Sequence, residues 1–382
     1  MEAFLRALLH DLERRCAVLR DRLAAIPADP DMRDHALGGY QVIERARRDT
    51  VQLLADPALG AQALLSNHLQ LYKRGNELAT LVESYVLPFV ERYNESDRRL
   101  TRLCRQLLAQ INWPLPVPLV ASVSSQYYWT QPAFNLICVP AAEDSTLLGL
   151  PDLCHELAHL LFLHHETDLI GDFLKQLAVY VAHAQQQIDG DQQPPEYEAL
   201  YDHLFTQWSD AWVQEFVADM VATYLAGPAF GWQHIRLCAG RGQAAYSPAL
   251  GETAEHPADE ARLRSVVAVL AYLKAEPIAA RVQELWTRYI RISGETPPLD
   301  YALCYPQELI TVLAERVVDG CRALGLRSFA QETDPPGRRD IPTLLVEAWE
   351  QFLGNPQNYL NWERVQLESL WRDLGFGTPR TP

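Results

Sequence analysis

Apolar residues recur with the period of an α-helix through the first 112 residues of the chain, with arginine and aspartate between them. Near the N-terminus, the positions that share one helical face are Leu5, Leu8, Leu9, Leu12, Leu19 and Leu23. The same period resumes over residues 61–91 and 96–111, and Gly38-Gly39 is expected to break the pattern before them. The sequence therefore predicts an N-terminal helical region over residues 1–115.

The period changes from helical to extended after three closely spaced prolines, Pro114, Pro116 and Pro118. Two apolar runs, at residues 119–123 and 134–139, predict the strands of a small sheet. The residues between these runs indicate a turn or rim: Tyr127, Tyr128, Trp129 and Pro132. An exposed edge strand of such a sheet can hold an extended peptide by backbone hydrogen bonds; alternatively, both strands are internal.

Helical patterns return after this sheet over three stretches, residues 168–187, 196–226 and 258–291. Gly227-Pro228 is expected to end the second stretch, because proline has no backbone N–H to donate. Residues 239–255 are expected to form a loop near a cleft, and residues 293–382 a C-terminal helical region. The whole pattern predicts a mainly α protein of the α+β class with one small sheet.

The composition is ordinary for a globular chain: of 382 residues, 48% are hydrophobic and 21% are charged. The formal net charge of −16 argues against nucleic acid or an anionic membrane as the main partner. It is compatible with a neutral or cationic protein or peptide substrate. No apolar run reaches the length of a membrane span, and the N-terminus lacks the basic start and apolar stretch of a signal peptide. We therefore expect no membrane span.

Seven cysteines are scattered along the chain without a CxxC pair. They are Cys16, Cys104, Cys138, Cys154, Cys238, Cys304 and Cys321. An odd, scattered set is poor material for a disulfide framework and is typical of proteins from a reducing compartment. The sequence therefore predicts a cytoplasmic protein, with Cys154 in the core and not in a metal site.

The strongest chemical signal is an HELAH segment, His155 to His159, inside an apolar run. Two histidines four residues apart on a helix project from one face, which suits two ligands of a single metal ion. Glu156 lies between them and is turned toward the open side of such a metal, where it can act as general base on a water molecule. Pro151 and Asp152 suit the first turn of this helix. The alternative is a chance match on a core helix whose histidines are satisfied by hydrogen bonds.

Two candidates exist for a third metal ligand. His165 has the spacing of the metzincin pattern, but that pattern needs a glycine where this chain has Phe162, so we expect His164 and His165 near the end of the helix. The better candidate is Glu215, four residues before Asp219 on an otherwise apolar helix. Two buried carboxylates one turn apart repel each other and lose hydration. A metal on Glu215, and a ligand histidine whose outer N–H is accepted by Asp219, resolve both problems. The alternative is an acidic pair on a solvated face.

A third motif, HPADEARL, begins at His256. This histidine can donate a hydrogen bond to the oxyanion of a tetrahedral intermediate. Arg262, six residues later, can pair with an acidic residue of the site. The alternative for both residues is a surface loop followed by a helix that begins at Pro257.

The motifs occur in the order HExxH, ExxAD and HPxxxxR followed by an aliphatic residue, over about residues 150–265. This order resembles the gluzincin branch of the zinc metallopeptidases, and the long gap before the glutamate resembles the family that contains the CAAX prenyl endopeptidases and their soluble bacterial relatives. The resemblance implies a zincin-like catalytic domain over residues 116–292. It implies that His155, His159 and Glu215 bind zinc and that Glu156 is the catalytic base. It also implies that Asp219 orients a ligand histidine and that His256 donates a hydrogen bond to the oxyanion. It does not extend to the spanning helices of the membrane members, nor to a prenylated or membrane-embedded substrate.

These features together predict a zinc-dependent endopeptidase, because zinc with three protein ligands keeps a fourth position open for water. The alternative is a non-catalytic, zinc-containing helical interaction protein, a degenerate zincin whose helical flanks recruit a protein partner. Glu156 and His159 also form the ExxH pair of a ferritin-like di-iron oxidase, but no second such pair is found.

Overall fold

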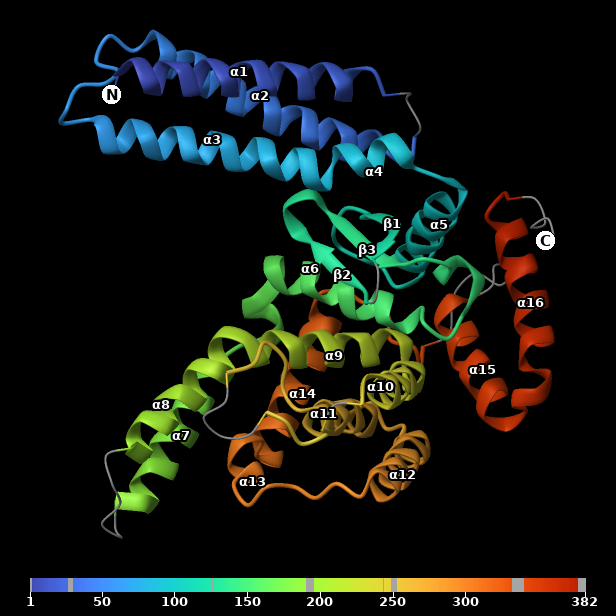
Figure 1. Cartoon of the computed structure of the whole chain (residues 1–382). Coiled ribbons are helices and arrows are strands. Elements are labelled where there is room, and N and C mark those ends of the chain that lie inside the picture. The colour runs from blue at the N-terminus through green and yellow to red at the C-terminus, as the bar shows by residue number, and fades with distance from the viewer. Residues whose placement is uncertain are drawn as a thin grey trace.

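The structure is a computed structural model in which helices predominate around one three-stranded sheet (Figure 1). It describes residues 2–26, 30–124, 127–189, 196–242, 244–248, 253–331 and 340–376. The N-terminal helices lie on one side of the sheet, and the larger group of helices lies on the other. The prediction of a mainly α protein with a small sheet is confirmed.

Three long helices pack side by side at the N-terminus: α1 (Glu2–Ala24), α2 (Arg33–Ala55) and α3 (Leu65–Tyr85). A short helix, α4 (Leu87–Arg92), continues from α3. Of the six leucines expected on one face, all but Leu8 are buried in α1. The break expected at Gly38-Gly39 is wrong, because α2 runs through it. A Cβ at Gly39 would lie 2.6 Å from Cγ1 of Val86, so glycine here permits close helix packing.

The sheet follows α5 (Glu95–Gln110) and has the strand order β1-β3-β2. The strands β1 (Leu119–Ser124) and β3 (Leu136–Pro140) were expected and run parallel to each other. The strand β2 (Trp129–Gln131) pairs antiparallel with β3 at the edge of the sheet, where a turn or rim was expected. The turn interpretation is therefore wrong for Trp129, whose backbone pairs with Cys138, whereas an edge strand is consistent with the rim.

The two faces of the sheet belong to different cores. Leu119, Ala121, Leu136 and Cys138 join the buried cluster of the N-terminal helices. The alternate side chains Val120, Ile137 and Val139 join the main core, as the two-residue period of a strand requires. The sheet therefore connects the N-terminal helices to the rest of the molecule.

The HELAH segment lies on α6 (Pro151–Ile170), which packs against α9 (Val213–Ala226). Every residue of α9 except Gln214 is buried. Between these helices in the sequence are α7 (Phe173–Asp189), α8 (Glu196–Gln207) and one π-helical turn, η3 (Trp208–Trp212). The helix expected from residue 168 begins instead at Phe173. α6 continues past His165, where the backbone angles φ −134° and ψ 29° make a kink.

The remaining helices complete the main core. They are α10 (Pro228–Arg241), α11 (Asp259–Tyr272), α12 (Glu276–Ser293), α13 (Tyr301–Cys304), α14 (Gln307–Ala323), α15 (Ile341–Gly354) and α16 (Pro356–Asp373). Two 3₁₀ turns, η1 (Pro132–Phe134) and η2 (Glu143–Ser145), lie near the sheet. Both α11 and α14 pack on α9, and α14 also packs on α6. One buried cluster thus draws residues from all three regions expected along the chain.

Gly227 has a φ of 62° and ends α9 as expected, but Pro228 then begins α10, which the sequence analysis did not foresee. The expected loop at residues 239–255 is therefore shortened at its start, and residues 243 and 249–252 of it lie outside the described part. Among the residues that the structure describes, no helix has the length and apolarity needed to cross a membrane.

Candidate metal centre

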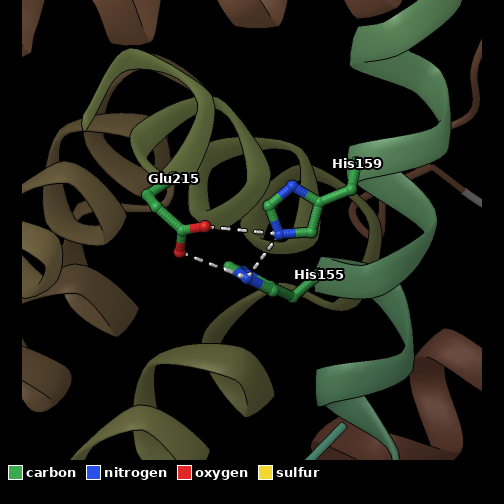
Figure 2. Close-up of side chains that lie close together, drawn as sticks. All are labelled: His155, His159 and Glu215. Carbon is green, nitrogen blue, oxygen red and sulfur yellow. Dashed lines mark hydrogen bonds and ion pairs between the residues drawn. The ribbon is translucent and has the colours of Figure 1, made fainter. Parts of the chain in front are cut away.

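Two buried helices bring three metal-binding side chains together. His155 and His159 project from successive turns of α6 toward Glu215 on α9 (Figure 2). The two Nε2 atoms are 3.1 Å apart, Glu215 Oε1 lies 3.5 Å from Nε2 of His159, and Oε2 lies 3.6 Å from Nε2 of His155. These are the three ligands expected from the motifs.

This donor set fits a zinc ion. Tetrahedral ligands at zinc–ligand distances of about 2.0–2.1 Å lie roughly 3.3 Å from one another, close to the separations found here. Among the described residues, nothing donates a hydrogen bond to the buried Oε2 of Glu215. The facing ring nitrogens and an unsatisfied carboxylate oxygen together form a site that a divalent cation would satisfy.

The other candidate ligand, His165, takes no part in this group. Its Nδ1 lies 2.9 Å from Oδ2 of Asp168, three residues later on α6. The kink at His165 follows the HELAH turns, so this imidazole does not continue the face that carries His155 and His159.

A chain of contacts from α11 fixes the orientation of His155. Its Nδ1 lies 2.9 Å from Oδ1 of Asp219, one turn after Glu215 on α9. Arg262 donates two hydrogen bonds of 2.7 Å to the oxygens of Asp219 and lies 3.6 Å from Glu215 Oε2. A carboxylate at the outer nitrogen holds a ligand histidine in the tautomer that leaves Nε2 free for metal.

His159 has a partner that the sequence analysis missed. The side-chain amide nitrogen of Gln214 lies 3.1 Å from Nδ1 of His159. Gln214 is the one residue of α9 that is not buried, so it approaches the ring from the solvent side. No signal in the sequence identifies it, because an exposed glutamine on a helix has no electrostatic cost and neighbouring residues of a helix face different sides.

The charges of the centre are strongly coupled. Burial alone would lower the pKa of His155, but the Asp219 and Glu215 carboxylates raise it to about 9. Burial and the charge of His155 lower the pKa of His159 to about 4. Burial acts to raise the pKa of Glu215, yet His155 and Arg262 hold it below its usual range. At neutral pH and without metal, the imidazole of His155 therefore carries a second proton and a positive charge. A divalent cation that binds here would displace this proton.

Glu156 faces the cleft on the same helix. Burial raises the pKa of its carboxyl group to about 7, although the charge of His155 and a hydrogen bond of 2.8 Å from the Thr130 hydroxyl act in the opposite direction. Thr130 belongs to the edge strand β2 and was also missed by the sequence analysis. A carboxyl group with a pKa near neutrality can both accept and return a proton.

A cavity of about 670 Å³ opens beside the centre. Its walls come from β2 and the residues before it, from α6, from α10 and from the start of the HPADEARL segment; they include Tyr128, Trp129, His155, Glu156, Phe230, His234, His256 and Arg262. His256 is exposed in this wall, and its charge lowers the pKa of Glu215. Arg262 is buried beneath it. Of the seven site residues expected from the sequence, four thus line this cleft: His155, Glu156, His256 and Arg262. The other three, His159, Glu215 and Asp219, lie behind the wall in contact with His155.

A second group of metal-binding residue types lies in the core. His234 and Cys238 are one turn apart on α10, and Asp259 begins α11. Nε2 of His234 lies 3.6 Å from Sγ of Cys238 and 3.1 Å from the backbone oxygen of Asp259. The sequence analysis missed this group because it did not foresee α10. This helix brings His234 and Cys238, which are four residues apart in the sequence, onto one face.

Comparison with protein-family models, curated proteins and solved structures found no match to this chain. The order of the three motifs is therefore the link to known enzymes, and it remains a resemblance. The functional argument depends on the geometry of the centre itself.

Proposed function

We propose that the protein is a zinc-dependent endopeptidase with a zincin-like core. The observation that carries the proposal is the convergence of His155, His159 and Glu215 beside a cleft wall that also contains Glu156. Two imidazoles and one carboxylate leave a fourth zinc position open, as in catalytic sites. The motif order supports the same assignment, because it gives each of these residues a role that their positions allow.

Each side chain has a distinct role in hydrolysis. When bound, zinc polarises a carbonyl group and lowers the pKa of a water molecule toward ~7. Glu156 accepts a proton from the attacking water and passes it to the leaving nitrogen, and Thr130 holds its carboxylate in place. His256 donates a hydrogen bond to the oxyanion from the opposite part of the wall. Asp219, held by Arg262, keeps His155 in the ligand tautomer.

Replacing the base separates chemistry from metal binding. Glu156→Gln should retain zinc but lower kcat/KM by about 10²–10⁴-fold, because the amide cannot accept the proton. Cleavage of labelled casein and of a random peptide pool gives the rate, and metal analysis of the same sample gives the zinc content. Glu166→Gln is the matched control, since Glu166 is exposed on the same helix.

Unchanged turnover in Glu156→Gln would end the peptidase proposal. A wild-type protein that binds zinc tightly but cleaves no protein or peptide would support the non-catalytic alternative.

A further inference from the structure

The last turns of α10 place two arginines in the cleft wall, Arg236 and Arg241. Arg236 is exposed and donates a hydrogen bond of 3.3 Å to Oε1 of Gln233. Arg241 is partly buried, with its Cζ 4.9 Å from the centre of the Tyr127 ring. Within the described residues, neither guanidinium forms an ion pair. The chain has 49 acidic and 33 basic residues, so a partly buried arginine without a carboxylate partner is unexpected.

The guanidinium of Arg241 has an unused donor. Its Nε is buried, and no described residue accepts a hydrogen bond from it. A buried donor that has lost water without gaining a partner costs free energy. The contact with the Tyr127 ring meanwhile restrains the guanidinium, whose planar fork suits two parallel hydrogen bonds to a carboxylate.

The carboxylates of the same wall are already committed to other donors. Tyr128 Oη donates a hydrogen bond of 2.8 Å to Glu143, and Gln233 Nε2 donates one of 2.7 Å to Asp152. These bonds neutralise neither arginine. The charges of both arginines act on Asp152, and that of Arg236 also acts on Glu143, so the wall holds charges of both signs. Among the described residues, however, none of these carboxylates forms a hydrogen bond or an ion pair with Arg241.

The location of Arg241 connects it to the path of a substrate. Arg241 and His256 line the metal cleft and also an adjoining hollow of about 720 Å³. A peptide that extends from the metal centre into that hollow passes both side chains. Arg241 is thus placed to contact the substrate away from the bond that is cut.

We propose that Arg241 binds a carboxylate of the substrate. This inference rests on the proposed peptidase function and names its substrate class: peptides with an acidic side chain or a free C-terminus near the cleavage site. The two sources present the same carboxylate chemistry, and the experiment separates them.

The test uses the full-length Glu156→Gln protein, so that no probe is consumed. The probes are hexapeptide pools of neutral residues that carry a neutral fluorophore. The first contains one internal glutamate and an amidated C-terminus, the second glutamine and a free C-terminus, and the third glutamine and an amidated C-terminus. Fluorescence anisotropy should show that the first or second pool binds about tenfold or more tightly than the third.

The preference should disappear when Arg241→Gln is added and should be partly kept with Arg241→Lys, which retains the charge without the planar fork. Arg291→Gln is the control for the loss of one charge, because Arg291 is exposed on α12 and does not line the cleft. Equal binding of the three pools, no binding of any, or a preference that survives Arg241→Gln would each overturn the inference.

Cleavage by the wild-type protein is measured separately. Hydrolysis without a preference for carboxylates would remove this inference and leave the peptidase proposal standing. A preference for carboxylates in binding without any hydrolysis would remove the peptidase proposal and leave the carboxylate-binding role of Arg241 standing.

Discussion

The part of the chain that the structure describes contains two compact groups of metal-binding residue types, and they differ in what surrounds the donor atoms. The first group is His155, His159 and Glu215; the second is His234, Cys238 and Asp259. In each group one ligand atom per residue lies within 4.8 Å of the others. Proximity alone therefore does not distinguish them.

In the first group the inner atoms contact one another, and the outer nitrogens are occupied by other side chains. Asp219 and Gln214 lie at the outer nitrogens of the two histidines, so both Nε2 atoms face the carboxylate of Glu215. In the second group, Nε2 of His234 is within hydrogen-bond distance of the backbone oxygen of Asp259. The His234 side chain is 3% exposed, against 12% for His155 and 14% for His159. A metal centre needs donor atoms that are not committed to the backbone and side chains that solvent reaches. Both histidines of the first group meet these conditions more fully than His234, although His234 also lines the cleft.

Metal content gives the sharpest separation of the two groups. His155→Ala and Glu215→Ala should each reduce the zinc content from about one ion per chain to none, because a ligand is lost. His234→Ala and Cys238→Ala should leave it unchanged. Metal analysis of the purified variants measures the difference. Loss of zinc from Cys238→Ala, or about two ions in the wild type, would reverse the interpretation of the second group.

Orienting carboxylates give a smaller difference. Asp219→Asn should weaken zinc binding about 10–100-fold, because His155 loses the acceptor that fixes its tautomer. Asp259→Asn is the matched change in the second group and should leave zinc affinity unaltered. Competition with a chromogenic chelator measures both. Equal affinities in the two variants would show that Asp219 does not support the centre.

The smallest expected difference is in the response of the metal-free protein to pH. Against burial, Asp219 raises the pKa of His155 from 6.5 to about 9, so its contribution to stability is complete below pH 6.5 and is lost as the pH rises through 9. Burial lowers the pKa of His234, so its contribution is lost as the pH falls below 6.5.

Urea unfolding at about pH 7 and pH 9.5 covers the range assigned to His155, which lies above the range assigned to His234. The stability lost between the two pH values should shrink by on the order of 1 kcal/mol in His155→Gln and should not change in His234→Gln. An equal response of both variants would contradict the assigned pKa directions.

The sequence predicted the elements whose periodicity is strong. The leucine repeat of α1 can be recognised because its spacing matches one buried helical face. The apolar runs of β1 and β3 can be recognised because both faces of these strands are buried. The strand β2 could not be identified, because three residues are too few to show a period. The start of α10 was hidden by the same glycine and proline that end α9.

The site residues that could be predicted from the sequence are those whose charged side chains cost free energy when they are buried. Glu215 and Asp219 in an apolar helix required a cation and a partner, and the structure supplies the histidines and Arg262. Thr130 and Gln214 were missed, because a threonine in an extended segment and a glutamine on a helix carry no such cost. Only the packing of β2 and α9 around α6 gives them their roles.

The hydroxyl of Thr130 couples the edge strand beside the cleft to the carboxylate of Glu156. It reaches Glu156 from a strand of three residues whose outer edge pairs with no other described strand. A displacement of this strand therefore also moves the donor of the carboxylate. A shift of about 1 Å is enough to break a hydrogen bond of this length. A ligand bound along β2 would therefore shift the carboxylate of Glu156.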